Sequence, residues 1–329
     1  MFSETVIRGV SFKPGLFCAP LAEVTHSAFR RLVTDFGGCG ALCTEMLAGR
    51  QILKDDLHSP YLRRNPGEKR LIYQLMLRRD DPIDRIIGRL SEIGPDGIDL
   101  NLACYAPVVR KVDACSRLFE NIPALTEVLQ AARRCWAGPL TVKIRLGHDV
   151  FDAREQFAER LRVIEESGVD AVTLHPRFFE DKLKRRARHE LFAWVASITR
   201  LPLIANGDIL GARTLRENPA LFEKMSGVMI GRMAIARPWI FAAWEQPMQV
   251  DYAGVWRRLH AYIREDFPPV TALKRIKLFT KYYARNFLFG HNFDCAVQNA
   301  PSLDAALERA NAFFSVSMDL HDEPSLMGL

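Results

Sequence analysis

Polar side chains that follow short apolar runs are the residues of this sequence that could carry chemistry. Cys104 bears a thiol, which can act as a nucleophile or as a general acid. Lys143 stands in an otherwise apolar run, and a buried ammonium group needs an anionic partner because an unpaired buried charge is costly. That partner could also be a neighbouring carboxylate. The other candidates are Ala19-Pro20-Leu21, Glu45, Gln74, Asn101, Arg145, His175, Arg177, Asn206-Gly207-Asp208 and Gly231-Arg232.

The apolar runs before these residues predict strands that are buried on both faces, because they are apolar at nearly every position. Eight such runs occur, at 15–18, 40–44, 71–76, 97–101, 140–144, 171–174, 201–205 and 227–230. Amphipathic segments that predict helices lie between them, for example at 80–93, 123–136, 153–167 and 190–199. Strands that alternate with helices indicate right-handed crossovers and a parallel sheet.

Eight strand–helix units in about 240 residues predict a (β/α)8 TIM barrel. An open doubly wound sheet is the alternative, but it calls for a glycine-rich fingerprint after the first strand, and residues 19–25 read Ala-Pro-Leu-Ala-Glu-Val-Thr. Beyond the barrel the strand-like runs stop, and segments 252–267, 271–287 and 303–314 predict helices. We expect a barrel domain at 1–245, a small helical domain at 246–318 and a tail at 319–329.

The carboxyl ends of the strands form the active face of such a barrel, and the loops after strands seven and eight often hold a phosphate group. Asn206-Gly207-Asp208 and Gly231-Arg232 occupy those two positions. Glycine lets backbone N–H groups approach an anion, and Arg232 can bind one bidentately. The same glycines could instead serve only to make tight turns.

The composition places the chain among ordinary globular proteins. It has 329 residues, 48% of them hydrophobic and 26% charged, and a net charge of +6 that is compatible with a polyanionic partner without requiring one. Its seven scattered cysteines and the lack of a signal peptide predict reduced thiols in the cytoplasm. Cys39 and Cys43 are too far apart for a CxxC pair, so we expect no metal. No apolar run reaches about 18 residues, so we expect no membrane span, and a monomer is the default.

Several strings, in this order and spacing, resemble the tRNA-dihydrouridine synthase family. They are Ala-Pro-Leu-Ala-Glu-Val-Thr at 19–25 with Phe29-Arg30, Thr44-Glu45-Met46, Gln74-Leu75, Asp-Leu-Asn-Leu-Ala-Cys at 99–104, Val-Lys-Ile-Arg at 142–145, His175-Pro176-Arg177, Ile-Ala-Asn-Gly-Asp at 204–208, and Gly-Val-Met-Ile-Gly-Arg at 227–232 with Pro238-Trp239. The helical remainder resembles the family's C-terminal RNA-binding domain.

The resemblance implies an FMN cofactor that NADPH reduces, hydride transfer from flavin N5 to uracil C6, and protonation of C5 by a cysteine. By matching position Cys104 is that acid, and Asn101, Arg145 and Arg177 contact the uracil, the target nucleotide or the RNA around it. Gln74, Lys143 and His175 contact the flavin or its side chain. Asn206, Gly207, Asp208, Gly231 and Arg232 hold the phosphate, while Pro20, Leu21 and Ala22 pass beneath the isoalloxazine ring.

This chain departs from the family pattern around the cysteine. Ala103 and Tyr105 replace the family's glycine and proline, Ala114-Cys115-Ser116 replaces Gly-Ala-Gly, and Met233 follows Gly231-Arg232 where the family has glycine. These losses of glycine predict a stiffer and differently shaped loop, and Cys115 is an alternative acid. The position and the RNA that are modified, and a preference for NADPH over NADH, stay open.

Basic residues predict contacts to the RNA backbone, because a uracil inside folded RNA must be extruded before a flavin can stack on it. Lys274, Lys277, Lys281 and Arg285 share one helical face, with Arg275 beside them, and a second cluster lies at 182–188. A solvated basic face is the alternative interpretation. Besides tRNA, we consider reduction of another RNA such as ribosomal RNA, reduction of free pyrimidines, and a non-catalytic RNA-binding paralogue.

Overall fold

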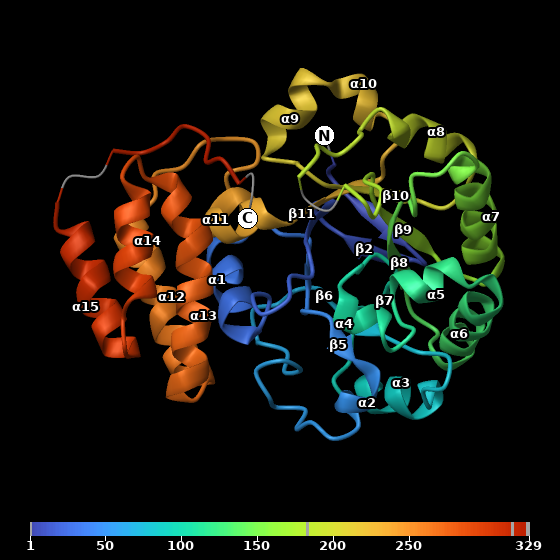
Figure 1. Cartoon of the computed structure of the whole chain (residues 1–329), viewed down its shortest axis with the longest axis horizontal. Helices are drawn as coiled ribbons and strands as arrows, with labels where there is room; N and C mark the ends of the chain where they lie inside the picture. The colour runs from blue at the N-terminus through green and yellow to red at the C-terminus, as the bar shows by residue number, and fades with distance from the viewer. Residues whose placement is uncertain (1, 182–183, 317–318, 327–329) are drawn as a thin grey trace.

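Parallel strands close into an eight-stranded barrel in the computed structural model, which describes residues 2–181, 184–316 and 319–326 (Figure 1). The strands are β3 (Leu16–Cys18), β4 (Ala41–Cys43), β6 (Leu71–Met76), β7 (Gly97–Asn101), β8 (Leu140–Arg145), β9 (Ala171–His175), β10 (Leu203–Asn206) and β11 (Gly227–Ile230). Pairing of β11 with β3 and of β4 with β6 closes the ring. The short β5 (Leu47–Ala48) adds to β6. The predicted TIM barrel is confirmed.

A hairpin covers the amino-terminal end of the barrel. Strands β1 (Thr5–Ile7) and β2 (Val10–Phe12) pair antiparallel, and Ile7 and Phe12 pack with Phe17 and Met229 in a fully apolar cluster. The sequence did not reveal this hairpin, because strands of three residues carry too little alternation to be recognised. With that end sealed, the carboxyl ends of the strands are the open face of the barrel.

Helices surround the strands, and the longer ones bury an apolar stripe, as Ile83, Ile86, Ile87 and Leu90 do on α3. They are α1 (Ser27–Phe36), α2 (Gly49–Ile52), α3 (Ile83–Ser91), α4 (Pro107–Arg110), α5 (Ser116–Glu120), α6 (Ile122–Cys135), α7 (Ala153–Glu166), α8 (Leu191–Ser197), α9 (Ala212–Glu217), α10 (Pro219–Phe222) and α11 (Arg232–Ala236). The four predicted segments agree with α3, α6, α7 and α8 to within a few residues. Figure 1 shows α4 over the open face of the barrel.

A helical domain lies beside the barrel, against α1 and α11 (Figure 1). After η1 (Pro238–Ile240) it contains α12 (Tyr252–Asp266), α13 (Pro269–Tyr283), η2 (Ala284–Asn286), α14 (Gly290–Gln298) and α15 (Leu303–Phe314). Aromatic side chains form its core, with Trp256, Phe287 and Phe293 fully or almost fully buried. The predicted boundary after residue 245 falls between η1 and α12, and residues 317–318 and 327–329 of the predicted helical domain and tail lie outside the described residues.

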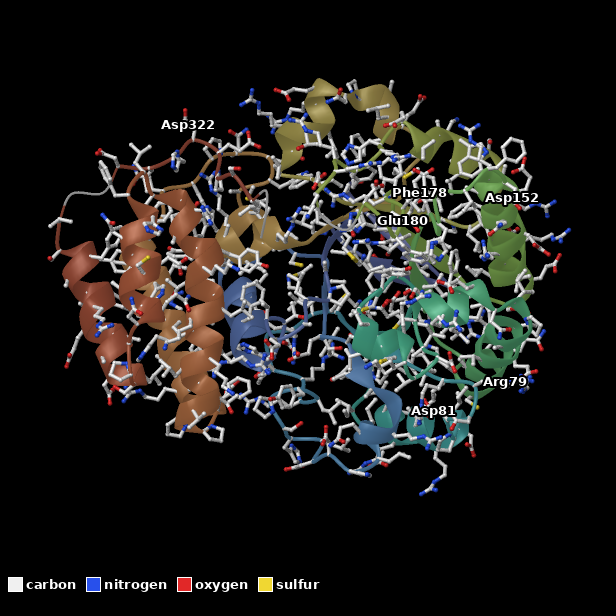
Figure 2. The ribbon with its side chains drawn as sticks, viewed as in Figure 1. Arg79, Asp81, Asp152, Phe178, Glu180 and Asp322 are labelled. Atoms are coloured by element: carbon white, nitrogen blue, oxygen red, sulfur yellow. The ribbon has the colours of Figure 1, made fainter. Side chains whose placement is uncertain are left out.

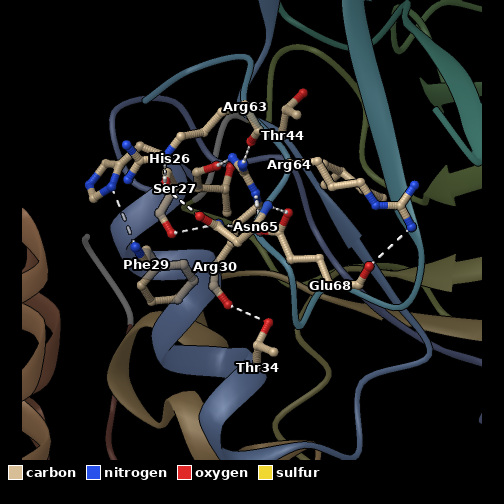
Figure 3. A network of polar contacts seen from close by, with 12 residues as sticks. His26, Ser27, Phe29, Arg30, Thr34, Thr44, Arg63, Arg64, Asn65 and Glu68 are labelled. Carbon is tan, nitrogen blue, oxygen red and sulfur yellow. Dashed lines mark hydrogen bonds and ion pairs between the residues drawn. The ribbon is translucent and has the colours of Figure 1, made fainter. Parts of the chain in front are cut away.

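A buried ion pair fixes the loop between β5 and β6 to the start of α1 (Figure 3). Arg30 Nε donates to Glu68 Oε1 at 2.8 Å, and both side chains are fully buried. The other Arg30 nitrogens donate to the carbonyl groups of Thr25 and Arg63 at 2.9 and 2.6 Å. Arg63 also pairs with Asp266 at the end of α12. The network therefore links the barrel rim to the helical domain.

Candidate active site

A cavity of about 920 Å³, counting the space at its open mouth, lies at the carboxyl ends of the barrel strands. The residues that line it follow six of the eight strands, together with one residue near the chain end. They are Ala19, Pro20, Leu21, Asn101, Ala103, Cys104, Lys143, Arg145, His175, Arg177, Asn206, Gly207, Asp208, Ile209, Leu210, Met229, Gly231, Arg232, Met233 and Leu326.

The cavity brings together most of the residues that the sequence singled out. Of the predicted cofactor and substrate residues, only five lie outside its lining: Ala22, Gln74, Lys274, Arg275 and Lys277. Ala22 is exposed, and Gln74 is buried behind the lining. The sequence missed the apolar wall residues Ile209, Leu210 and Leu326, because apolar side chains near a site look like core residues.

The loop that carries Cys104 is held by Asn101 at the end of β7. Asn101 Oδ1 accepts hydrogen bonds from the backbone N–H groups of Ala103 and Cys104 at 3.0 and 2.9 Å. Its Nδ2 donates to Gln74 Oε1 at 2.9 Å, and Gln74 Nε2 donates to Asp99 Oδ2 at 2.7 Å. Asn101 and Gln74, predicted as uracil and flavin contacts, thus act first in positioning the cysteine.

Tyr105 fastens the same loop to its neighbours. Its ring stacks on Phe179, with centroids 4.7 Å apart, and the Arg110 guanidinium lies 4.3 Å above its centroid. The His148 ring contacts Tyr105 edge-on at 5.7 Å. Stacked rings and a cation over a ring each stabilise by about 0.5–1.5 kcal/mol, so Tyr105 fixes a loop that lacks the family's proline.

Two carboxylates, Glu120 and Glu180, complete this cluster around Tyr105, Phe179, Arg110 and His148, which we call the Tyr105 latch. His148 Nε2 lies 3.2 Å from Glu120 Oε1, and His148 Nδ1 contacts Glu180, which Figure 2 labels beside Phe178. Burial opposes ionisation of Glu120, but the hydrogen bond from Arg110 outweighs it and lowers the pKa of Glu120. Glu120 is therefore ionised at neutral pH and holds Arg110 over the Tyr105 ring.

Lys143 is a cation in the cavity wall that forms no ion pair among the described residues, although the charge of Asp99 nearby partly opposes the fall in its pKa. No acceptor among the described residues lies within hydrogen-bonding distance of its ammonium group. Burial, and then the charge of Arg145, lower the pKa of Lys143 from 10.5 to about 8. Burial and the same cations hold the pKa of His175 well below its ordinary value, so this imidazole is neutral. An anion beside Lys143 would relieve the cost of burying its charge.

Asp208, which follows β10, binds two arginines of the cavity wall. Its Oδ2 accepts from Arg177 Nη2 at 2.5 Å, and its Oδ1 accepts from Arg232 Nη2 at 3.2 Å. A carboxylate does not bind an anion, so these contacts favour a positioning role for Asp208 over the predicted direct contact with a phosphate. Arg177 also lies 2.9 Å from His175 Nε2. The arginines are thereby oriented before any ligand enters.

Gly207 packs directly against His175, a contact that the sequence did not predict. Its φ is +102°, and a Cβ atom there would lie 2.5 Å from His175 Cδ2. Any larger residue would therefore be strained and would displace His175. This glycine is required by the packing of the site as well as by its turn.

Comparisons with known proteins decide the family. The family model described as dihydrouridine synthase matches residues 17–273. The chain belongs to the dihydrouridine synthase family. It is 30% identical over 313 residues to tRNA-dihydrouridine synthase B from Proteus vulgaris, covering 89% of this chain and 94% of that protein. It is 26% identical over 283 residues to a probable tRNA-dihydrouridine synthase from Aquifex aeolicus, covering 84% of each.

A solved structure supports the barrel fold of this dihydrouridine synthase family member. The old yellow enzyme homologue from Zymomonas mobilis aligns with a TM-score of 0.52 over 72% of this chain and 90% of that one. The two sequences are 12% identical, so this similarity concerns the fold alone.

The predicted basic surface of α13 is exposed in part. Lys274, Lys281 and Arg285 are exposed and Lys277 is half-buried. Arg275 departs from the prediction, because it is nine-tenths buried, with its guanidinium 5.6 Å from the Phe267 ring centroid. It can contact RNA only after a rearrangement.

The second basic cluster follows β9 on the open face. Lys184, Arg185 and Arg186 are exposed, Arg188 is half-buried over the Phe178 ring, and Lys182 lies outside the described residues. One basic surface thus lies on the helical domain, and the other lies on the open face of the barrel.

Two further searches cover only the described residues. Within them no helix has both the length and the apolar character needed to cross a membrane. The same residues contain no group of three or more His, Cys, Asp or Glu side chains placed to hold a metal ion.

We predict that Tyr105→Ala releases the cysteine loop of this family member. Loss of the Phe179 and Arg110 contacts removes about 1–2 kcal/mol from the closed loop, which corresponds to a factor of about 5–30 in its opening equilibrium. Alkylation of Cys104 by iodoacetamide, followed by mass spectrometry, should accelerate accordingly. Phe151→Ala is the control, because that ring is fully exposed. Equal alkylation rates in wild type and Tyr105→Ala would show that the latch does not restrain the loop.

Proposed function

We propose that this protein reduces uridine to 5,6-dihydrouridine in tRNA, with FMN as its cofactor and NADPH as the reductant. The observation that carries the proposal is the cavity, in which the ammonium group of Lys143 and the loop that bears the Cys104 thiol line one pocket. Membership of the dihydrouridine synthase family and relatives named as tRNA-dihydrouridine synthases support the substrate class.

The cavity residues fit a flavin with a phosphate group. Ala19, Pro20 and Leu21 offer an apolar surface for a planar ring, and Lys143 offers positive charge to a ring that becomes negative when reduced. Asn206, Gly207 and Gly231 line the cavity at the ends of β10 and β11, where this fold often binds a phosphate, and this supports the proposed phosphate site. When bound and reduced, the flavin supplies the hydride that adds to uracil C6.

Cys104 supplies the second half of the reaction. Its Sγ–H donates a proton to uracil C5 as the C5–C6 double bond becomes single, and the thiolate regains a proton from water. Asn101 fixes the backbone of this cysteine, and the stacking of Tyr105 on Phe179 holds the loop in place. General acid catalysis depends on such positioning, because the donor must reach the proton acceptor within hydrogen-bonding distance.

The basic surfaces fit the backbone of the RNA. Lys274 and Lys281 lie on α13, Arg285 lies on η2 directly after it, and Lys184–Arg186 lie on the rim of the open face. Phosphate contacts of this kind make affinity fall with salt and leave sequence choice to other groups. The surfaces therefore support an RNA substrate over a free pyrimidine.

Reduction of RNA by the purified protein tests the proposal. Transcribed tRNA, transcribed ribosomal RNA and free uridine are incubated separately with the protein, FMN and NADPH or NADH, and dihydrouridine is mapped by mass spectrometry. We expect product in tRNA with NADPH. Product only in ribosomal RNA or only from uridine would reassign the substrate. A protein that binds RNA but no FMN would instead be a non-catalytic RNA-binding paralogue.

We predict that the affinity for reduced FMN falls as pH rises above about 8. Lys143 is charged in the free protein below this pH, whereas above it the protein must take up a proton to bind an anionic ring. The dissociation constant should rise by up to about tenfold per pH unit, measured by anaerobic fluorescence titration between pH 6.5 and 9.5. Lys143→Met should bind more weakly and lose this pH dependence. An unchanged pH dependence in that variant would assign it to another group.

A further inference from the structure

Residues that follow α15 pack against the rest of the protein. Residues 319–326, which we call the C-terminal strap, return from the helical domain toward α11 (Figure 1). Leu320 forms an antiparallel bridge with Phe287. Leu288 N donates to Asp319 O at 2.9 Å, and His321 N donates to Asn286 O at 2.8 Å. The first residues of the strap are thus paired with the end of η2 and the residues after it.

Arg237, directly after α11, holds the middle of the strap. Its Nη2 donates to the carbonyl oxygens of His321 and Asp322, both at 2.9 Å, and its Nε donates to Asn286 Oδ1 at 2.8 Å. Asn286 is fully buried, and its Nδ2 donates to Ala236 O at 2.7 Å. The side chain of Asp322, labelled in Figure 2, is exposed. The strap is therefore attached through its backbone, from one side.

The far end of the strap reaches the cavity. Arg232 Nη1 donates to Leu326 O at 2.9 Å, while its Nη2 donates to Asp208. Leu326 is only 6% exposed and lines the cavity together with Gly231 and Met233. These two residues follow β11, at the end of the cavity where a phosphate is expected. Leu326 thus places a buried apolar side chain beside the Arg232–Asp208 pair.

We propose that the C-terminal strap forms the outer wall of the phosphate end of the cavity and retains the flavin mononucleotide there. Release of the cofactor then requires Leu326 to leave the cavity and its carbonyl group to separate from Arg232. The inference rests on the proposed flavin function. It assigns a cofactor-binding role to a segment outside the barrel, and to Arg232 a role in fastening that segment.

Flavin release from the loaded protein tests this inference. FMN-saturated protein is diluted into buffer with apoflavodoxin as a trap for free FMN, and the transfer of flavin is followed by its fluorescence and absorbance. Leu326→Gly removes the wall side chain and leaves the backbone contacts, and a chain that ends at residue 318 removes the whole strap. Ser325→Gly is the matched control, because Ser325 is the exposed neighbour of Leu326.

We expect FMN to dissociate about tenfold faster from Leu326→Gly, which corresponds to about 1.4 kcal/mol, and at least as fast from the shortened chain. Ser325→Gly should match the wild type. Unchanged release from Leu326→Gly in a correctly folded protein would contradict the proposal that the strap retains FMN. Slower release from the shortened chain would contradict it too, because the strap would then obstruct FMN binding. If the wild type binds no FMN, the proposed cofactor fails and the strap role fails with it.

Discussion

Replacement of Cys104 by alanine is expected to reduce the rate of dihydrouridine formation by about 10²–10⁴-fold, the usual contribution of a positioned general acid. The thiol lines the cavity, and Asn101 binds the backbone N–H group of the same residue, so the substitution removes the proton donor and leaves the loop in place. Flavin content and RNA affinity should stay close to wild type. Single-turnover reduction of transcribed tRNA by the pre-reduced protein measures the chemical step directly.

Cys115→Ala is the matched control for that experiment. The Cys115 thiol is fully buried, lies 3.7 Å from Met46 Sδ and does not line the cavity. Burial, and then the proximity of Cys104, raise the pKa of Cys115 well above its ordinary value, so the thiol neither reaches a substrate nor ionises easily. We expect nearly full activity. Wild-type turnover in Cys104→Ala combined with loss of activity in Cys115→Ala would move the acid to Cys115.

The barrel could be predicted because its signal is repeated. Eight largely apolar runs followed by polar residues fix the strand ends, and in a parallel barrel all those ends meet on one face. Lys143, His175 and Gly207 were therefore predicted to line one site from their positions alone, and the cavity contains all three. Patterns that are short or occur once carry no such signal, as the β1–β2 hairpin and α14 show.

The contacts between side chains could not be predicted, because they depend on directions that spacing does not contain. Asp208 occupies a predicted phosphate position, yet its carboxylate binds Arg177 and Arg232. Arg275 is adjacent to an exposed basic face, yet it points into the interface between the domains. Leu326 lies in a stretch without periodicity, and only the folded chain places it in the cavity. In each case the residue type indicated which contacts were chemically possible, but the sequence did not identify the residue that makes them.

Arg30→Met is expected to lower the free energy of unfolding by about 3–5 kcal/mol, because it leaves the Glu68 carboxylate buried without its cation. The sequence marked Arg30 only as part of a family string. In the structure both side chains are fully buried, and Arg30 also serves the carbonyl groups of Thr25 and Arg63 (Figure 3). Urea unfolding followed by circular dichroism measures the change.

Two further variants distinguish a buried charge from a general loss of arginine. Arg213→Met removes the Arg213–Glu217 pair, whose side chains are 75% and 55% exposed, and should cost no more than about 1 kcal/mol. Adding Glu68→Leu to Arg30→Met should recover part of the loss, because no unpaired charge then stays buried. If Arg30→Met lowers the free energy of unfolding no more than Arg213→Met does, the Arg30–Glu68 pair does not hold the loop before β6. Because Arg63 of that loop pairs with Asp266, the proposed RNA contacts of the helical domain predict that a loosened loop also weakens RNA binding.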